Sequence, residues 1–441
     1  MKTRRAPSPP SQSSQTPVPP QVVEIEKPVY GGNFLARQEG RAVFVPLALP
    51  GETVRVSITE NKSGYSTAEL AGIITTAPER ISPRCPQFGP CGGCNYQHTD
   101  YATQLAFKLA ILRETLERAG VPVPEEIGVC SADPWAYRNR IRVAFDAEGN
   151  PGYRGRRSHA IVSIRECPIA APLLVAAAQV ASEVLARVPS NLRPHELLLF
   201  CDPSECALLA TFFVPGATQL RFDVIAQALQ DRIPVLKGAE LATGGRPGRP
   251  PQTLAQWGAE SLVYPAAGFG YRVDQGAFFQ VNRWLIDSFV SCVIGDAKGA
   301  LAWDLYAGVG LFARQLTARF DRAVAVESAP ASTAALAANL VGASGEAIPS
   351  STLEFLRGKR GGPRPDLIVV DPPRTGLEGG VGPLLTEIGA PHFVYVSCDP
   401  ATLARDLRIL LAGGYAIESL TLADLFPQTF HLETVVSLRR S

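Results

Sequence analysis

The sequence predicts an α/β protein with three folded parts: a small β-barrel, a central α+β domain and a C-terminal doubly wound sheet. From Val22, short β-type runs are separated by Gly, Asn and Pro turns, as in a barrel of about five strands. A cysteine-rich loop, a helical segment and a mixture of strands and helices follow. From about Ala277, short apolar runs alternate with helical segments, which is typical of a largely parallel sheet covered by helices.

Length and composition agree with this organisation. The 441 residues exceed one typical domain, and 46% of them are hydrophobic, enough for a large core. No apolar run reaches the roughly 18 residues that span a bilayer, and the N-terminus lacks the apolar stretch of a secretory signal. We therefore expect a cytoplasmic protein without membrane contact, and a monomer. The net charge of +1 means that any nucleic-acid site must be a local basic patch.

Composition changes along the chain suggest the domain limits. Residues 1–20 are rich in Pro, Ser and Gln and cannot bury enough apolar surface to order themselves, so we expect a disordered tail. The Gly/Arg/Pro-rich stretch at 241–252 predicts a mobile loop. The predicted folded parts are the barrel at 21–80, the central domain at 81–276 and the doubly wound domain at 277–441.

A glycine-rich turn indicates a cofactor that contains a nucleoside. DLYAGVGLFA places Gly308 and Gly310 between an apolar strand and a helix, where bare backbone can approach a ligand. Glu327 ends the next strand, about 20 residues later, where a carboxylate can accept hydrogen bonds from ribose hydroxyls. The third glycine that seats a pyrophosphate is missing, which favours a cofactor without phosphates. The alternative is a packing turn in an ordinary α/β protein.

Two later strands end in residues that can carry chemistry. DLIVVDPPRTGL fixes Asp371 at the carboxyl edge of the sheet with a rigid turn. FVYVS runs into Cys398, and Asp399 and Pro400 are expected as the N-cap and first residue of a helix. Because the positive end of a helix lowers a thiol pKa, we expect Cys398 to be a nucleophile. The alternative is a small buried hydrophobic side chain.

Two candidate general bases precede the last strand. His431 and Glu433 lie in DLFPQTFHLETVVSL, and their alternate spacing points both side chains to one side of an extended backbone. Either could accept a proton.

Four of the nine cysteines suggest a metal site. Cys85, Cys91 and Cys94 are separated by five and two residues, and both Cys85 and the distant Cys167 are followed by Pro. Four thiolates can hold zinc or an iron–sulfur cube, but structural zinc sites more often use two short paired knuckles. The spacing therefore favours a [4Fe-4S] cluster, with zinc as the alternative. The other non-catalytic cysteines are expected to be core residues, namely Cys130, Cys201, Cys206 and Cys292.

At these segments the chain resembles the RNA uracil-5-methyltransferase family, in particular members that modify 23S ribosomal RNA and carry a TRAM domain and an iron–sulfur cluster. The resemblance covers about residues 22–441. It is carried by GAFFQVN at 276–282, DLYAGVG, DPPRTGL, VSCDPATLARDL, FPQTFHLE and CPQFGPCGGCNYQH. It implies an RNA-binding TRAM barrel and a Rossmann-like class I methyltransferase domain that uses S-adenosyl-L-methionine.

The resemblance also implies residue roles. Cys398 would be the nucleophile and Glu433 the base, with His431 in support. Two positions depart from the family pattern: Ala307 stands where Cys is usual, and SSTLEF at 350–355 lacks the acidic residue often found near adenine. The second departure leaves adenine recognition unassigned. The residues implied around the cofactor and target base are Gln280, Tyr306, Glu327 and Asp371.

The implied reaction is methylation of a uridine at C5. This carbon is a poor nucleophile, so a thiolate must first add to C6, and a base must later remove the C5 proton to let the thiol leave. The expected substrate is 23S rRNA, with uridine 54 of tRNA as the alternative. An amino-group methyltransferase would share the acid and two prolines but needs no cysteine, and usually has an aromatic residue at the position of Arg374. Retention of Cys398 and Glu433 argues against a noncatalytic iron–sulfur RNA-binding protein.

Two basic segments are candidates for RNA contacts. YRNRIRV at 137–143 and GYRGRRSH at 152–159 interleave Arg with aromatic residues, which suits phosphate contacts and base stacking on unpaired RNA. A solvated basic strand is the alternative.

Overall fold

The computed structural model describes residues 20–244 and 251–440, and the chain divides into two compact units, Met1–Arg80 and Ile81–Ser441. The predicted disordered tail lies outside the described residues except for Pro20, as does the centre of the predicted mobile loop at 245–250. Among the described residues, no helix is long and apolar enough to cross a membrane.

The first unit is a closed five-stranded barrel, as predicted. Alternate side chains of the first and fourth strands point inward, so that Val23, Ile25, Val54 and Val56 are buried. Closure removes the unpaired strand edges that would otherwise invite association. The strands follow the order β1-β2-β3-β5-β4 around the barrel and are β1 (Gln21–Val29), β2 (Asn33–Gln38), β3 (Arg41–Pro46), β4 (Thr53–Lys62) and β5 (Tyr65–Thr75).

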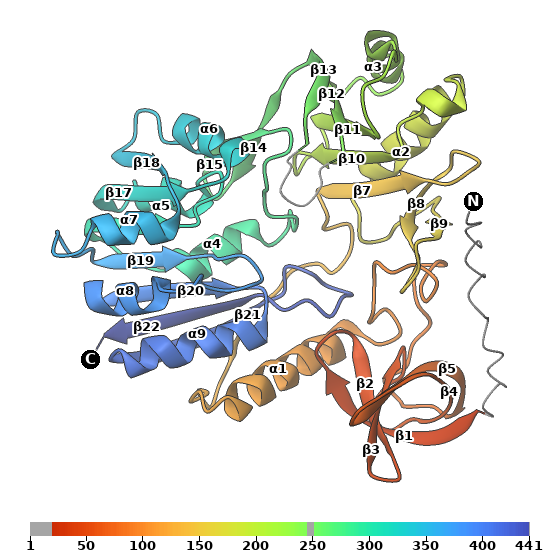
Figure 1. Cartoon of the computed structure of the whole chain (residues 1–441), viewed down its shortest axis with the longest axis horizontal. Helices are drawn as coiled ribbons and strands as arrows, with labels where there is room; N and C mark the ends of the chain where they lie inside the picture. The colour runs from red at the N-terminus through yellow and green to blue at the C-terminus, as the bar shows by residue number, and fades with distance from the viewer. Residues whose placement is uncertain (1–19, 245–250, 441) are drawn as a thin grey trace, which may run out of the picture. The chain divides into compact units, whose positions relative to one another are not determined.

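The central part of the second unit is built on a seven-stranded sheet (Figure 1). Its strands follow the order β13-β12-β11-β10-β7-β8-β9, and two helices, α2 (Pro172–Leu185) and α3 (Phe222–Gln230), pack on it. A short 3-10 helix at Ser190–Leu192 and a separate hairpin of β14 (Ser261–Ala266) and β15 (Phe269–Asp274) complete this part. The sheet strands are β7 (Arg140–Phe145), β8 (Pro151–Arg154), β9 (Ile161–Ser163), β10 (Glu196–Cys201), β11 (Leu208–Val214), β12 (Leu236–Thr243) and β13 (Thr253–Gly258).

The C-terminal part is an eight-stranded sheet with the order β18-β17-β16-β19-β20-β22-β21-β6 (Figure 1). The first five strands of this order are parallel, and β22 runs antiparallel to both of its neighbours. This confirms the predicted doubly wound, largely parallel sheet. The strands are β6 (Gly128–Cys130), β16 (Gly299–Leu305), β17 (Phe320–Glu327), β18 (Gly345–Pro349), β19 (Leu367–Val370), β20 (His392–Ser397), β21 (Tyr415–Ala423) and β22 (Thr434–Arg440).

Apolar side chains on both faces bury this sheet under helices. All four residues of β19 are buried, which is typical of a parallel strand covered on both sides. On one face, Trp303 and Phe355 meet edge-on with ring centroids 5.0 Å apart, and on the other Phe289 and Phe312 do so at 5.7 Å. The helices are α1 (Tyr101–Arg118), α4 (Ile286–Ile294), α5 (Leu311–Leu316), α6 (Pro330–Asn339), α7 (Thr352–Gly358), α8 (Val381–Ile388) and α9 (Pro400–Ala412).

Two elements from early in the chain join this sheet. Strand β6 pairs in parallel with β21. Helix α1 packs against α9, and the two helices lie side by side in Figure 1. The sequence did not predict either contact, because a three-residue strand has no readable periodicity and a helix does not specify its partner. Whether the chain divides into independent domains at residue 276 therefore stays a prediction.

Candidate active site

A cavity of about 770 Å³ opens at the carboxyl ends of the parallel strands. Strand β16 has β17 on one side and β19 on the other, so the order of the strands in the sheet changes direction at β16. Doubly wound sheets bind ligands at such a switch point. The cavity brings together segments that are far apart in the sequence. The predicted site residues that line it are Gln280, Tyr306, Gly308, Glu327, Asp371, Cys398 and Glu433.

The glycine turn after β16 shapes one end of the cavity. Tyr306 and Gly308 both have left-handed backbones, with φ of 65° and 57°, and such a conformation costs a residue other than glycine about 1 kcal/mol or more. A side chain added at Gly308 would meet no atom within 4 Å, so the turn faces open space. A ligand can therefore approach the bare backbone here.

Glu327 is held by three backbone N–H groups. Gly308 donates to its Oε2 at 2.8 Å, while Ser328 and Ala329 donate to its Oε1 at 2.7 and 2.6 Å. These bonds fix the carboxylate at the end of β17 and leave further lone pairs of both oxygens for a ligand. The predicted position for ribose binding is therefore preorganised.

Gly310 lies away from the cavity lining. Its φ of 91° places it as the N-cap of α5, and an added Cβ would come within 2.7 Å of the Leu336 side chain. This glycine therefore permits helix packing, which differs from the cofactor contact expected from the sequence. Below the turn, fully buried Asp304 accepts a hydrogen bond from Ala313 N at 2.8 Å, and its Oδ1 has no partner in the described part of the chain.

Hydroxyl groups line the cavity beyond β18. Ser350, Ser351 and Thr352 contribute to its wall, and Ser351 also caps α7 by accepting a hydrogen bond from Glu354 N. The segment that lacks an acidic residue thus still offers polar groups. Sequence reasoning missed them because β18, the strand that brings them to this edge, was not predicted from its short GEAIP run.

Cys398 occupies the predicted place at the end of β20. Asp399 caps α9 by accepting hydrogen bonds from Ala401 N and Thr402 N at 3.0 and 2.9 Å, and Pro400 is the first helical residue. Both predictions about this turn are confirmed.

The predicted low pKa of the thiol was wrong. Burial raises the pKa of Cys398 to about 12, and the Glu433 and Asp371 carboxylates raise it further, while Arg374 opposes them. The N–H groups at the start of α9 point at Asp399, so the positive end of the helix is already neutralised by its cap. The thiol therefore needs a proton acceptor close by before it can attack.

Two carboxyl groups beside the thiol are held close to protonation. Burial raises the pKa of Asp371 to about 7. Burial also raises the pKa of Glu433 well above its usual value, the Asp371 charge raises it further, and Arg374 opposes this. Like charges in one poorly solvated site resist simultaneous ionisation. A cation near the two carboxyls would be stabilised by their ionised forms, so the site fits a ligand that carries a positive charge.

His431 is a weaker base than Glu433. Burial and the nearby Arg374 guanidinium lower the pKa of His431 to about 4, and its Nδ1 lies 3.1 Å from Arg374 Nη2. The imidazole is therefore neutral at pH 7 and one of its nitrogens is occupied. Of the two candidate bases, Glu433 has the greater affinity for a proton.

The segment at 276–282 closes another side of the cavity. Gln280 is buried, and Phe279 packs on Tyr264 with ring centroids 4.6 Å apart. In contrast, the neighbouring Phe278 lines the cavity with 60% of its surface exposed. An exposed aromatic ring in the wall of a cavity is suited to stacking on a nucleobase. Sequence reasoning quoted this segment without assigning the aromatic residue.

The four cysteines of the predicted metal site line one cavity of about 360 Å³. Burial is the first cause of raised pKa values at Cys85, Cys91 and Cys94, and in each case the Cys167 thiol adds to it. The mutual effect places these thiols near one another, and four sulfur donors match a cube or zinc. However, no group of three or more His, Cys, Asp or Glu side chains in the described residues has a ligating arrangement. The predicted [4Fe-4S] cluster is thus not confirmed and stays a prediction.

The remaining cysteines only partly match the prediction of core residues. Cys130 and Cys201 are buried and Cys292 is half-buried. Cys206 is exposed, which corrects the prediction, because it lies in the turn between β10 and β11.

The aromatic residues of the two basic segments do not form a stacking surface. Tyr137 is fully buried, and Tyr153 packs against the central core. Arg142 and Arg154 share Glu196, with separations of 2.9 and 3.1 Å. These side chains pack within the central part or pair with Glu196, which the sequence did not predict. Any RNA contacts from this region would therefore come from its exposed arginines.

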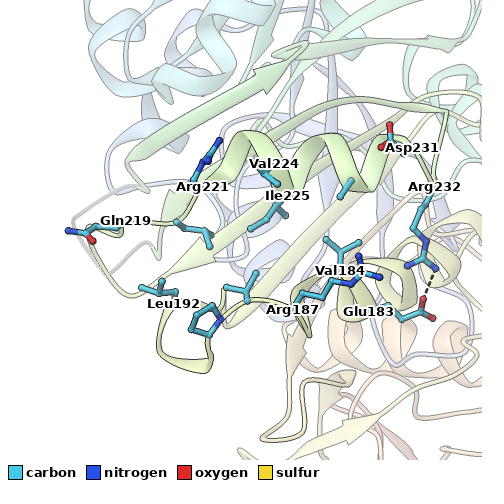
Figure 2. A pocket seen from close by; sticks show the side chains of 14 residues that line it. Glu183, Val184, Arg187, Leu192, Gln219, Arg221, Val224, Ile225, Asp231 and Arg232 are labelled. Atoms are coloured by element: carbon cyan, nitrogen blue, oxygen red, sulfur yellow. Dashed lines mark hydrogen bonds and ion pairs between the residues drawn. The ribbon is translucent and has the colours of Figure 1, made fainter.

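A second cavity, of about 570 Å³, lies between α2 and α3 (Figure 2). Aliphatic side chains such as Val184, Val224 and Ile225 form it, and Figure 2 shows Arg232 paired with Glu183 at one end. All the charged residues that line it are exposed, so no polar group is held in its floor. None of the predicted site residues contributes to it.

Comparison with known proteins agrees with this geometry. A family model described as tRNA (Uracil-5-)-methyltransferase matches residues 364–441, and a TRAM domain model matches residues 20–71. An uncharacterized RNA methyltransferase of Streptomyces avermitilis is 33% identical over 440 residues, covering 94% of this chain and 97% of that protein. The 23S rRNA (uracil(1939)-C(5))-methyltransferase RlmD of Chromohalobacter salexigens is 32% identical over 449 residues, covering 95% and 89%.

A solved structure shares the fold over nearly the whole chain. The tRNA (uracil-54, C5)-methyltransferase of Pyrococcus abyssi, in complex with S-adenosyl-L-homocysteine, superposes with a TM-score of 0.76 and covers 95% of this chain and all of that one. At 22% sequence identity this likeness establishes the fold. Together with the near full-length relatives above 30% identity, it shows that the chain belongs to the RNA uracil-5-methyltransferase family and carries an N-terminal TRAM domain.

Proposed function

We propose that the chain transfers the methyl group of S-adenosyl-L-methionine to C5 of a uridine in RNA, with Cys398 as nucleophile and Glu433 as base. The observation that carries the proposal is that one cavity is lined by a thiol, a buried carboxyl group and a glycine turn beside a fixed carboxylate. These groups come from the ends of different strands of the same sheet, and each matches one requirement of the reaction.

The residues that would hold the cofactor lie on the side of β16 and β17. The Gly308 backbone and the fixed Glu327 carboxylate could bind the ribose of the cofactor. The hydroxyl groups of Ser350, Ser351 and Thr352, after β18, could bind its adenine. When bound, S-adenosyl-L-methionine supplies an electrophilic methyl group on a positive sulfur. Asp371 and Glu433 favour a positive charge in their neighbourhood, because ionised carboxyls there would otherwise repel each other.

The reaction requires two proton transfers, one from the Cys398 thiol and one from C5 of the uracil, and carboxyl groups of the site accept both protons. As Cys398 gives up its proton to a nearby carboxylate, its sulfur bonds to C6 of the uracil and an electron pair moves to C5 and O4. After C5 has taken the methyl group, Glu433 removes the C5 proton, the C5=C6 double bond re-forms and the C6–S bond breaks. The raised carboxyl pKa values reduce the cost of taking a proton from a thiol whose pKa is about 12.

We propose 23S rRNA as the substrate. Support comes from the name of the Chromohalobacter salexigens relative, a 23S rRNA enzyme that aligns along most of both chains. The alternative, a tRNA, is favoured by the printed function of the solved structure with the same fold. The TRAM domain would bind RNA in either case, and Phe278 would stack on a base at the cavity mouth.

We also propose that Cys85, Cys91, Cys94 and Cys167 hold a [4Fe-4S] cluster. The support is that four thiols, and no imidazole or carboxylate pair, face one cavity together with Arg138, whose charge would offset thiolate charge. The cluster would join the loop at 85–94 to the segment around Cys167 without entering the methyl transfer.

RNA containing 5-fluorouridine at the target should form a covalent complex with the protein, because fluorine at C5 cannot be removed as a proton. We expect Cys398→Ala to abolish the complex on a denaturing gel. Cys206→Ala, which removes an exposed thiol outside the lining of the active-site cavity, should leave the complex unchanged. A complex that survives in the Cys398→Ala variant would mean that another residue is the nucleophile.

Glu433→Gln should slow release of the enzyme from methylated natural RNA by about 10²- to 10⁴-fold. The base must be ionised to accept a proton, so the raised pKa of Glu433 predicts that the wild-type release rate rises with pH and then levels off. Single-turnover kinetics between pH 5 and pH 9 would show this rise lost in Glu433→Gln and retained in His431→Gln. A rise that persists in Glu433→Gln would exclude it as the base.

Protein purified without oxygen should be brown and contain about four iron atoms per chain. Cys167→Ser should lower the iron content, whereas Cys206→Ser should not change it. Stoichiometric zinc in the wild-type protein would contradict the cluster proposal.

Deletion of the gene should remove one 5-methyluridine from 23S rRNA and leave tRNA unchanged. Mass spectrometry of nuclease digests of both RNAs checks this directly. Loss confined to tRNA would replace the rRNA proposal by the tRNA alternative.

A further inference from the structure

We infer that Lys108 and Gln104 of α1, with Asn95 of the cysteine loop, position the catalytic base. They do so by holding the connection between β21 and β22, Asp424–Leu432, which leads directly into Glu433. We call these nine residues the base segment. The inference rests on the proposed function, because it assumes that Glu433 removes the C5 proton.

The base segment has no regular structure and yet lies inside the protein. Asp424, Leu425, Gln428 and Thr429 are at most 1% exposed, and Leu432 is fully buried. Buried irregular backbone must find hydrogen-bond partners elsewhere, since it lacks the internal ladder of a helix or sheet. The positions of those partners therefore set its path.

Four successive carbonyl groups of the base segment accept hydrogen bonds from distant parts of the chain. The donors are Asn282 Nδ2 to Leu425 O at 3.3 Å, Lys108 Nζ to Phe426 O at 3.0 Å, Tyr137 Oη to Pro427 O at 3.0 Å, and Asn95 N to Gln428 O at 2.8 Å. None of these donors belongs to β21 or β22. Because Asn95 follows Cys94 directly, the cysteine loop is itself one of the supports.

Lys108 also forms a buried ion pair with the base segment. Its side chain is fully buried, and its Nζ lies 2.6 Å from Asp424 Oδ1 as well as on Phe426 O. Tyr101 donates from its hydroxyl to the other Asp424 oxygen at 2.9 Å. A buried charge with one partner removed is strongly disfavoured, so the ammonium and the carboxylate hold each other in place.

Gln104 fixes the tip of the base segment. Its Nε2 donates to Gln428 Oε1 and its Oε1 accepts from Gln428 N, both at 3.0 Å. Gln428 has a φ of 68°, a left-handed backbone that residues other than glycine rarely adopt. The two hydrogen bonds between Gln104 and Gln428 stabilise this left-handed turn, which we expect to change conformation without them.

The base segment connects these supports to the cavity. Ala423 N donates to Glu433 O at 2.9 Å, so the two ends of the segment are joined beside the base. Phe426 and His431 of the same segment line the cavity. In contrast, Cys398 is placed by β20 and α9, and neither element contributes a donor or acceptor to the hydrogen bonds described above. Losing the supports should therefore misplace the base while leaving the nucleophile in position.

The test compares two steps of the reaction in Gln104→Leu and Lys108→Met. Adduct formation with 5-fluorouridine RNA requires Cys398 and should stay within about threefold of the wild type. Release from natural RNA requires Glu433 and should slow by about 10²-fold, the cost of a displacement near 1 Å. Lys237→Met, at an exposed lysine of β12, is the matched control and should change neither step.

A double variant separates positioning from folding. Lys108→Met alone leaves Asp424 buried without its cation, which lowers the melting temperature. Lys108→Met/Asp424→Leu removes both charges and should recover much of the melting temperature. Release should nevertheless stay slow, because Phe426 O has lost its connection to α1 and its remaining donors, Thr429 N and Oγ1, belong to the base segment itself.

Three results would overturn the inference. A release rate that returns with the melting temperature in the double variant, or an adduct step that slows as much as release, would mean a purely structural role. The third is unchanged release in Gln104→Leu and Lys108→Met while Glu433→Gln is slow. If Glu433→Gln itself releases RNA normally, the proposed function fails along with the inference.

Discussion

The crowding of acidic groups around one thiol is the constraint on which the rest of the site depends. Burial raises the pKa of Asp371 to about 7. Burial and the neighbouring carboxylates raise the pKa of Cys398 to about 12 and shift the pKa of Glu433 upward as well. The site therefore favours a ligand that brings positive charge and a substrate that can share protons. The Arg374 guanidinium supplies part of that charge, and burial together with this guanidinium lowers the pKa of His431 to about 4, which keeps the imidazole neutral.

The sheet explains how such a site is assembled. Parallel strands end at one edge, so strand order alone brings together the glycine turn, the Glu327 carboxylate and the Cys398 thiol. Glu433 is different, because it enters from antiparallel β22 after an irregular buried segment. Its position relies on side chains from α1 and on the loop that carries Cys85, Cys91 and Cys94. Asn95, which follows Cys94 in this loop, donates to Gln428 O and so connects the cysteine loop to the base segment.

The four cysteines show where sequence and structure carry different information. Their spacing predicts a metal site, and the fold brings all four to one cavity, but the described side chains are not arranged as a ligand set. In the basic segments, the structure contradicts the prediction more directly. Tyr137 was predicted to stack on RNA, but it is buried and donates a hydrogen bond to the base segment. Composition shows which groups a segment offers, whereas burial decides whether they reach a ligand.

Local patterns determined much of this protein. Alternation of apolar runs and helices predicted the doubly wound sheet, the β-type runs predicted the barrel, and Asp399-Pro400 predicted the start of α9 after Cys398. These features depend on neighbouring residues, so a sequence can report them. The tertiary structure alone decided the high pKa of Cys398, the packing role of Gly310 and the joining of β6 and α1 to the C-terminal sheet. Each of these depends on which distant groups exclude water or approach within a few ångströms, and that follows only from the packed chain.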